Sequence, residues 1–533
     1  MNLIEELREC LRISGLHPEP EQSIAVGLHI ARLLRDVQCC YRCCLRFTRC
    51  NKMKIYKASE QDLQTAFNSL AKLLDVKPVS NDEEVQVASG CPACLGALGW
   101  MDQPENIQGI FDKIDTENYD CKRVNLNCTM PVSSLHRSHL LGVYVSDRLS
   151  DFPPSVLEIW NSEPVHDPKD AFKAVISDKL VERYGWTMDP VTAPLRMTIV
   201  LDHLETALEH RFLTQVKEPV MKLRKVRQNR KSIVAGESRT TITEALAALS
   251  KEEAYSLTAI PPLPPTTQIT LADVAMVHES TIVGGRYLKM SREYSQTPWE
   301  IKGKRLAEFS VSEAIEEIIK RYHRCDNSKF VTAGREDANV RMLGTGRPFY
   351  CELINPRKPV LADEEYKKIE DEINNQDSKD AVQVRHLCKI SPSDTKIIKE
   401  GEETKCKSYR ALVWISQPIT DEIIEKVNKV GSAPFKIQQT TPLRVFQRRS
   451  AAIREKEIHT CHLERVDGAS LSGVESQFGV LTLNTQAGTY IKEFVHGDLG
   501  RTLPNLATLT GAVGADLIEL DVLDVDLVWP PKK

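Results

Sequence analysis

Apolar and polar positions along the chain follow two different periods. Two short apolar runs in the first half, residues 140–145 and 195–201, have the length and composition of buried strands. In the second half, patterns with helical and with strand spacing alternate. The helical patterns cover residues 311–322 and 363–375, and the strand candidates are residues 349–354, 410–415 and 480–485. This mixture predicts an α+β fold.

Changes in pattern divide the chain into four parts, residues 1–119, 120–258, 259–280 and 281–533. The first two parts predict an accessory region of α/β character. The third part contains the string IPPLPP from Ile260 to Pro265, which predicts an extended polyproline linker outside any core. The last part is long enough for a separate domain in which helices cover a mixed or antiparallel sheet.

Composition and charge narrow the class of protein. Of the 533 residues, 41% are hydrophobic and 27% are charged, as in an ordinary soluble protein of several domains. The formal net charge of -4 does not indicate a nucleic-acid partner, so local basic patches must carry that argument. No apolar stretch approaches the roughly 18 residues of a membrane span, and we expect no membrane association.

Residues 1–16 predict an amphipathic helix that carries Glu5, Glu6 and Glu9. Such acidic residues are untypical of a transit peptide, and the segment lacks the apolar centre of a signal peptide. We therefore expect the protein in the nucleus, the cytoplasm or both. The 15 cysteines should then be reduced or metal-bound rather than paired in disulfides.

Two CxxC pairs stand out among the cysteines. Cys40 and Cys43 form the first pair, and Cys91 and Cys94 form the second. Each pair can present two thiolates from a tight turn, and two such turns complete a closed tetrahedral site for a structural zinc ion. Cys39 and Cys44 flank the first pair, so its ligand register stays open. The alternative is a group of small buried cysteines with one chance spacing.

Asp337 lies between Arg335 and Arg341 in a stretch with a glycine at each end, Gly334 and Gly344. Positive charge on both sides would keep this carboxylate ionised, and the glycines allow tight turns. The pattern suits a nucleophile that acts on a polyanion. A solvated surface loop is the alternative.

Three later segments place basic or aromatic residues in similar settings. Tyr409 follows Lys407 at the start of a strand candidate, where a ring beside cations could stack on a base. Arg444 and Arg448 belong to a dense arginine cluster that suits a phosphate track. Lys492 lies near an expected helix start, and Asp337 is a candidate partner for it. A further basic run, residues 222–231, predicts either a phosphate contact or a solvated helix face.

Taken together, four strings resemble the motifs of a known enzyme family. They are GREDANVRMLGTGRPF, KSYRALVW, TPLRVFQRR and TQAGTYIKEFVHGDLGRT, in this order. The resemblance is to the archaeal and eukaryotic family of T-loop tRNA pseudouridine synthases, and it covers residues 286–533. In that family the N-terminal part carries a zinc site and a THUMP-type RNA-binding region. The resemblance therefore implies a zinc-binding region at 1–119, a THUMP-like region at 120–258 and a catalytic domain at 281–533.

The resemblance also implies roles for single residues. Asp337 would be the catalytic nucleophile, Tyr409 would stack on the flipped uracil, and Lys492 would pair with Asp337. Ile491 would pack beneath the base, and Arg335 would enter the RNA stack as the uridine leaves. Many members of the family have arginine where this chain has Lys492.

The implied substrate is tRNA, at uridine 54, uridine 55 or both, with other structured RNAs as further partners. No organic cofactor is expected, and the chain contains neither a dinucleotide fingerprint nor a P-loop. We expect a monomer. The alternative function is an RNA-binding scaffold with a degenerate synthase domain.

Overall fold

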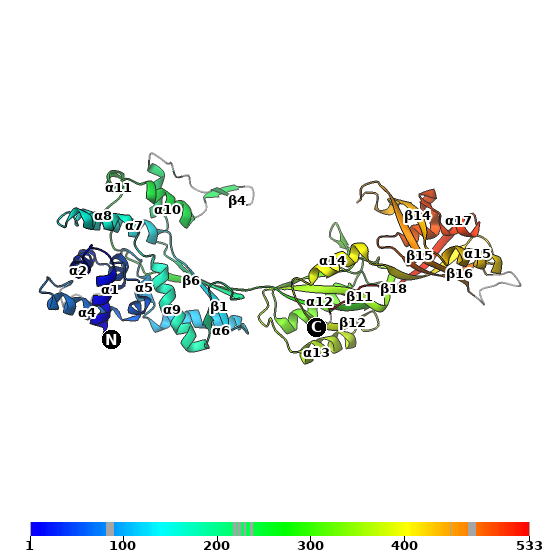
Figure 1. Cartoon of the computed structure of the whole chain (residues 1–533), viewed down its shortest axis with the longest axis horizontal. Coiled ribbons are helices and arrows are strands. Elements are labelled where there is room, and N and C mark those ends of the chain that lie inside the picture. Colours follow the sequence, from blue (N-terminus) through cyan, green and yellow to red (C-terminus); the bar gives the residue numbers. More distant parts are fainter. Residues whose placement is uncertain are drawn as a thin grey trace. The chain divides into compact units, whose positions relative to one another are not determined.

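In the computed structural model, the chain divides into two compact units, residues 1–277 and 278–533 (Figure 1). The structure describes residues 2–80, 90–216, 221, 225–228, 231–234, 238–447, 449–466 and 476–531. Both units combine helices with sheets, so the predicted α+β class is confirmed.

Unit 1 is a helical assembly around a small sheet. Its described helices are α1 (Leu3–Ile13), α2 (Pro20–Asp36), α3 (Tyr41–Phe47), α4 (Glu60–Leu73), α5 (Ala97–Trp100), α6 (Pro104–Glu117), α7 (Ser133–Asp147), α8 (Pro154–Ser162), α9 (Pro168–Tyr184), α10 (Arg239–Ala248) and α11 (Lys251–Leu257), with the short 3-10 helices η1 (Met53–Lys57) and η2 (Glu209–Gln215). The sheet has the order β2-β1-β3-β6, formed by β1 (Arg123–Thr129), β2 (Thr187–Met188), β3 (Leu195–Asp202) and β6 (Thr270–His278). One hydrophobic core extends from Leu7 to Met276 through this unit.

Three sequence predictions for unit 1 need correction. Residues 140–145 are not a strand but part of α7, which buries Leu140, Leu141, Tyr144 and Val145. This spacing returns to one helix face, and a short apolar run does not distinguish a buried strand from a buried helix. The basic run 222–231 is not a helix where it is described, because β4 (Lys225–Gln228) pairs with β5 (Lys231–Val234) in a hairpin.

The segment expected as a linker, residues 259–280, also differs from the prediction. Its second half contains β6, which is a strand of the unit 1 sheet. In its first half Pro262 and Pro265 are buried, and the carbonyl oxygen of Leu263 accepts a hydrogen bond of 2.8 Å from the buried Arg137. Proline rings are apolar, so a proline-rich string can line a core as readily as it can bridge two domains.

Unit 2 is built on a mixed sheet that has ten strands within the described residues. Nine follow the order β12-β7-β11-β18-β13-β16-β15-β14-β17, and β10 pairs with β11. The strands are β7 (Thr281–Lys289), β10 (Asn327–Thr332), β11 (Val340–Ile354), β12 (Val382–Ile390), β13 (Lys407–Ile415), β14 (Phe435–Thr440), β15 (Ile453–Arg465), β16 (Phe478–Thr485), β17 (Thr502–Leu503) and β18 (Ala515–Val525). Only the pairing of β11 with β18 is parallel among those described.

Along the chain, the helices of unit 2 alternate with the strands of this sheet. They are α12 (Val311–His323), α13 (Asp363–Asn375), α14 (Thr395–Thr404), α15 (Asp421–Gly431), α16 (Ile491–His496) and α17 (Leu506–Thr510), with the 3-10 helices η3 (Leu443–Val445) and η4 (Gly497–Gly500). The predicted helices at 311–322 and 363–375 are confirmed as α12 and α13. In α13, Tyr366, Ile369 and Ile373 return to one buried face, which packs on β12. No helix in the described parts of the chain has the length and apolar character needed to cross a bilayer.

Strand β11 changes register at Gly344, shortly after the aspartate loop. Val340 to Met342 pair with β18, and pairing with β7 then resumes at Arg347 after a bulge. Gly344 has a φ of +60°, and a Cβ atom there would lie 1.9 Å from the carbonyl oxygen of Leu523. Only glycine lets the backbones of β11 and β18 approach this closely.

We predict that Gly344→Ala lowers the free energy of unfolding of unit 2 by about 2 kcal/mol, because the new methyl group overlaps a backbone oxygen and the φ is unfavourable. Scanning calorimetry should show the unit 2 transition shifted down by about 5 °C. Gly514→Ala is the matched control, since a Cβ at Gly514 meets nothing within 4 Å and its φ is not positive. Equal melting of the two variants would contradict the prediction.

Candidate active site

Asp337 lies in the loop between β10 and β11, where the backbone turns sharply. Gly334 opens this loop with a φ of +92°, and a Cβ there would lie 2.8 Å from Lys407 Nζ and 3.0 Å from Arg347 Nη1. The amide of Val340 donates to the carbonyl oxygen of Asp337 at 3.0 Å, which ends the turn at the first residue of β11. The Asp337 side chain is about half exposed, so its carboxylate remains accessible.

Two cations from distant parts of the chain meet this carboxylate. Lys492 Nζ lies 2.9 Å from Asp337 Oδ2, and Arg444 Nη1 lies 3.3 Å from the same oxygen. Lys492 belongs to the first turn of α16, and Arg444 belongs to η3. Lys492 also donates to Asn339 Oδ1 at 3.3 Å, so the loop itself helps to hold the ammonium group.

These cations decide the protonation state of Asp337. Partial burial opposes ionisation, but the hydrogen bond and charge of Lys492, with the charges of Arg444 and Arg335, hold the pKa of Asp337 below its usual value. The group is therefore a carboxylate at neutral pH. Because ammonium and guanidinium groups hold it on one side only, its exposed side can face a substrate.

A buried ion pair holds the loop that carries Asp337. Glu336, the residue before Asp337, places Oε2 2.7 Å from Arg347 Nε, and both side chains are almost completely buried. Tyr287 donates to Glu336 Oε1 at 2.7 Å. Arg347 also donates to the carbonyl oxygen of Ala333 at 2.8 Å, and Gln296 donates to that of Gly334 at 3.0 Å. The first half of the loop, from Ala333 to Glu336, is thereby held in place by buried side chains.

Lys289, at the end of β7, holds the backbone around Asp337. Its ammonium group is fully buried and donates to the carbonyl oxygens of Ala338 at 2.6 Å and Tyr294 at 2.9 Å, with a longer contact of 3.5 Å to that of Asp337. Burial lowers the pKa of Lys289 to about 8, and the charge of Glu336 opposes this shift.

Arg444 does more than the sequence predicted. It was expected on a phosphate track, but its Nε donates to Glu493 Oε1 at 2.7 Å while its Nη1 contacts Asp337. The Glu493 side chain is only 2% exposed and follows Lys492 in α16. The buried glutamate therefore aims an exposed arginine at the aspartate, and α16 supplies both Lys492 and the anchor of Arg444.

Of the remaining predicted site residues, three are described by the structure and differ in their burial. Tyr409 is half-buried on β13, between β16 and β18, where burial raises its pKa to about 12 against the opposing charge of Arg347. Ile491, the first residue of α16, is buried in the core of unit 2. Arg335 is exposed at the rim of the loop. Arg448 lies outside the described residues.

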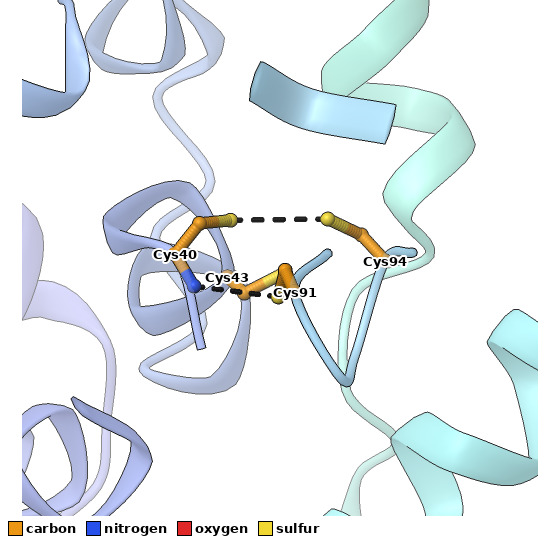
Figure 2. Close-up of side chains that lie close together, drawn as sticks. All are labelled: Cys40, Cys43, Cys91 and Cys94. Carbon is orange, nitrogen blue, oxygen red and sulfur yellow. Dashed lines mark hydrogen bonds between the residues drawn. The ribbon is translucent and has the colours of Figure 1, made fainter. Parts of the chain in front are cut away.

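The four cysteines of the CxxC pairs come together in unit 1 (Figure 2). Their sulfur atoms all lie within 4.8 Å of one another, and Cys40 Sγ lies 3.8 Å from Cys94 Sγ. Zinc–sulfur bonds of about 2.3 Å in a tetrahedron separate the sulfurs by about 3.8 Å. The cluster is therefore compatible with a zinc ion. Cys43 and Cys44 belong to α3, whereas Cys91 and Cys94 lie in a loop before α5.

The structure also shows which of the neighbouring cysteines belong to the cluster. The buried Cys39 is not a member of the cluster, and Cys44 turns its thiol toward the carbonyl oxygen of Ala31 at 3.6 Å. Arg46 is fully buried and its Nη1 donates to Cys43 Sγ at 3.1 Å. This guanidinium group places positive charge against a cluster that would be strongly negative as thiolates.

Several residues of the site escaped the sequence analysis, among them Lys289, Gln296, Asn339, Arg347 and Glu493. Glu336 precedes Asp337 and Glu493 follows Lys492 in the sequence. This adjacency to predicted site residues is the one feature of the sequence that could have indicated them. Arg347 lies in the same string as Asp337, ten residues later, but nothing in the string shows that it turns back to Glu336. Lys289 and Gln296 come from an earlier segment, and no local pattern connects them with Asp337.

Comparison with known proteins matches both units to one family. The family described as "Pus10, C-terminal" matches residues 282–526, and the family described as "Eukaryotic Pus10, N-terminal" matches residues 91–276. Part of a solved archaeal box H/ACA sRNP Nop10–Cbf5 complex covers 45% of this chain and 47% of its own at 13% identity, with a TM-score of 0.22.

The chain is also similar over most of its length to curated relatives named tRNA pseudouridine synthase Pus10. The Xenopus laevis protein is 36% identical over 456 residues, which cover 85% of this chain and 84% of the relative. The Mus musculus protein is 33% identical over 541 residues and 94% of this chain, with 98% of the relative covered. The predicted family resemblance is therefore confirmed. The chain belongs to the Pus10 family of tRNA pseudouridine synthases, and it is an enzyme of the isomerase class, a pseudouridine synthase.

Proposed function

We propose that unit 2 converts uridine to pseudouridine in the T loop of tRNA, at position 54, position 55 or both, with Asp337 as the nucleophile. The observation that carries this proposal is the half-exposed Asp337 carboxylate, 2.9 Å from Lys492 and 3.3 Å from Arg444. A carboxylate that is ionised at neutral pH and held in one orientation is the group that a nucleophilic role requires. The names of the relatives supply the substrate class.

In the proposed reaction the target base leaves its stack before any bond changes. Flipping a nucleotide costs a few kcal/mol, and stacking on the Tyr409 ring would offset part of that cost. Ile491 would pack beneath the uracil, and Arg335 would occupy the space left in the RNA stack. Arg444 and Arg448 would contact the RNA backbone.

Asp337 would then attack the nucleoside, either at ribose C1′ or at the uracil ring. The bond between C1′ and N1 breaks, the uracil rotates, and a bond forms between C1′ and C5. C5 loses its proton, N1 carries one in the product, and Asp337 is released. The product is an isomer of the substrate, so the reaction itself consumes no redox equivalent or organic cofactor.

For unit 1 we propose an RNA-binding role. Residues 120–258 would form a THUMP-like region that contacts the tRNA away from the target uridine, and the described parts of the basic run lie on the β4–β5 hairpin. Zinc in the Cys40, Cys43, Cys91 and Cys94 cluster would join α3 to the loop before α5. Such a closed four-sulfur site is structural and leaves no open position for catalysis.

We predict that Asp337→Asn abolishes pseudouridine formation, because the amide is no nucleophile, while tRNA affinity stays within about threefold. Pseudouridine should be mapped in an unmodified tRNA transcript after incubation with purified protein, and affinity measured by filter binding. Asp371→Asn, on the exposed face of α13, is the matched control and should react normally.

Two results would decide against this proposal. Residual conversion by Asp337→Asn would refute the nucleophile. A wild-type protein that binds tRNA but never forms pseudouridine would favour the alternative, an RNA-binding scaffold with a degenerate synthase domain.

We predict that Lys492→Ala lowers the rate of pseudouridine formation about a hundredfold, since one of two charges that orient the carboxylate is lost. Lys492→Arg should keep most of the activity because guanidinium also pairs with a carboxylate. In the wild-type protein the pKa of Asp337 lies below its usual value. Removal of the Lys492 ammonium group raises this pKa toward the usual value, but Asp337 stays ionised at neutral pH. Raising the pH from 6 to 8 should therefore not rescue Lys492→Ala; rescue would contradict an orienting role.

We predict that wild-type protein contains one zinc ion per chain and that Cys91→Ser loses it, together with the folded state of unit 1. Structural zinc sites contribute on the order of 10 kcal/mol to folding in small domains. Zinc content by mass spectrometry and the melting of unit 1 are the measurements. Cys44→Ala is the control and should retain zinc, because Cys44 is not in the cluster. A folded, metal-free Cys91→Ser would refute the structural role.

A further inference from the structure

Three successive backbone carbonyl groups of the loop that carries Asp337 contact cations from one short segment. Lys289 donates to the carbonyl oxygen of Ala338 at 2.6 Å and lies 3.5 Å from that of Asp337. Arg292, three residues after Lys289, donates from Nη1 to the carbonyl oxygen of Asn339 at 3.0 Å. Lys289 thus holds the middle of the loop, and Arg292 holds its last residue before β11.

Arg292 is itself anchored on β18. The same Nη1 donates to the carbonyl oxygen of Leu520 at 2.9 Å, and Nη2 lies 2.7 Å from Glu519 Oε2 and 2.7 Å from Asp521 Oδ1. A guanidinium group has a rigid fork of donors, so it can bridge two backbone segments and a carboxylate in one geometry. Arg292 therefore fixes the position of Asn339 relative to β18.

A second arginine shares the Asp521 anchor. Arg341, in β11, donates to Asp521 Oδ1 from Nε at 2.8 Å and to Oδ2 from Nη2 at 2.5 Å. The sequence predicted Arg341 as a charge beside Asp337, but its guanidinium group pairs with Asp521 instead. Burial opposes ionisation of Asp521, yet the two arginines hold its pKa below the usual value. This buried carboxylate is therefore charged at neutral pH and holds both arginines.

The side chain of Asn339 connects this network with the candidate active site. Its Oδ1 accepts a hydrogen bond of 3.3 Å from Lys492 Nζ, which lies 2.9 Å from Asp337 Oδ2. An ammonium group is a point charge on a flexible stem, so one partner alone does not fix its direction. Asn339 supplies a second acceptor and, being neutral, leaves the charge of Lys492 to Asp337.

We propose that Arg292 and Asn339 are positioning residues for the reaction: Arg292 holds the backbone of Asn339 against β18, and the Asn339 amide directs Lys492 toward Asp337. Both act through Lys492 and leave contact with the substrate to other groups. Asn339 then gives the lysine the direction that a guanidinium fork would have by itself. This inference rests on the proposed function, because it takes Asp337 to be the nucleophile.

The first test measures single-turnover pseudouridine formation in a tRNA transcript with the full chain. Asn339→Ala should lower the rate constant about tenfold, the typical effect of one hydrogen bond to a charged group, with tRNA affinity unchanged. Arg292→Ala should lower the rate constant by a similar factor. Asn339→Asp retains an oxygen acceptor for Lys492 and should keep most of the rate.

Double variants test whether the two residues act along one path. Effects within one hydrogen-bond network are not additive, so Arg292→Ala/Asn339→Ala should be no slower than the slower single variant. In a Lys492→Ala background the ammonium group is missing, and Asn339→Ala should have no further effect. Additive losses in either combination would overturn the inference, since the residues would then act independently.

A second measurement follows Lys492 without the reaction. Lysines are acylated with an amine-reactive ester, and the labelled peptides are quantified by mass spectrometry. Lys492 should react about threefold faster in Asn339→Ala and in Arg292→Ala than in wild-type protein, because an amine that has lost a hydrogen-bond partner is more often available. Unchanged labelling in both variants would contradict the positioning of Lys492.

Matched controls come from helices α12 and α13. Arg321→Ala removes an exposed arginine that pairs with Glu372, and Asn375→Ala removes an exposed asparagine. Both controls should match wild-type protein in rate, tRNA affinity and labelling of Lys492. Equal melting of all variants excludes misfolding. If Arg292→Ala melts at a lower temperature, Asn339→Ala, which removes no ion pair, still decides.

The outcomes separate this inference from the proposed function. If Arg292→Ala weakens tRNA binding and its salt dependence but leaves the rate of bound tRNA unchanged, Arg292 contacts RNA and the inference is overturned. If wild-type protein forms pseudouridine and both single variants match it in rate and labelling, the inference is overturned and the proposed function stands. If wild-type protein forms no pseudouridine, the proposed function fails, and the labelling of Lys492 still tests the two positioning residues.

Discussion

The site depends on one ion pair, that of Asp337 with Lys492. The carboxylate is half exposed, so the pair contributes little to folding, as is usual for ion pairs in contact with water. Its importance is geometric: the ammonium group fixes both the ionisation and the direction of a carboxylate that must stay accessible. Arg444 adds a second charge from a third segment. A loop, a 3-10 helix and a helix that follow different strands of one sheet must therefore lie close together, and the order of the strands determines whether they do.

The neighbouring glutamate shows how this precision is obtained. Glu336 and Asp337 are adjacent in sequence but face opposite environments, since Glu336 points into the core and Asp337 toward solvent. A buried pair such as Glu336 with Arg347 has a desolvation cost that its attraction offsets only in good geometry, and loss of one partner costs about 3–5 kcal/mol. The pair therefore clamps the loop, and Lys289 holds the following carbonyl oxygens. The exposed Asp337 carboxylate is placed by charged groups that are themselves buried.

Unit 1 uses buried cations for a related purpose. Arg137 donates to the carbonyl oxygen of Pro92, within the second CxxC pair, and to that of Leu263, within the proline-rich segment. Gly90, just before that pair, leaves no space for a Cβ beside Pro265. The cysteine cluster and the proline-rich segment are thus packed together. A change in the turn of the second CxxC pair would therefore disturb residues far along the chain.

The sequence by itself indicated the candidate site residues Asp337 and Lys492, because GREDANVR and TYIKEF are short local motifs that can be recognised without the tertiary structure. It also determined helices with a strong period, such as α13. Only the tertiary structure decided which residues of those strings meet: that Cys40 rather than Cys39 joins the cluster, that Arg444 turns to Asp337, and that Glu493 anchors it. It also placed residues 140–145 in a helix and residues 270–278 in a strand. The meetings of side chains join residues from 49 to 107 positions apart in the chain, and local periodicity carries no information about such contacts.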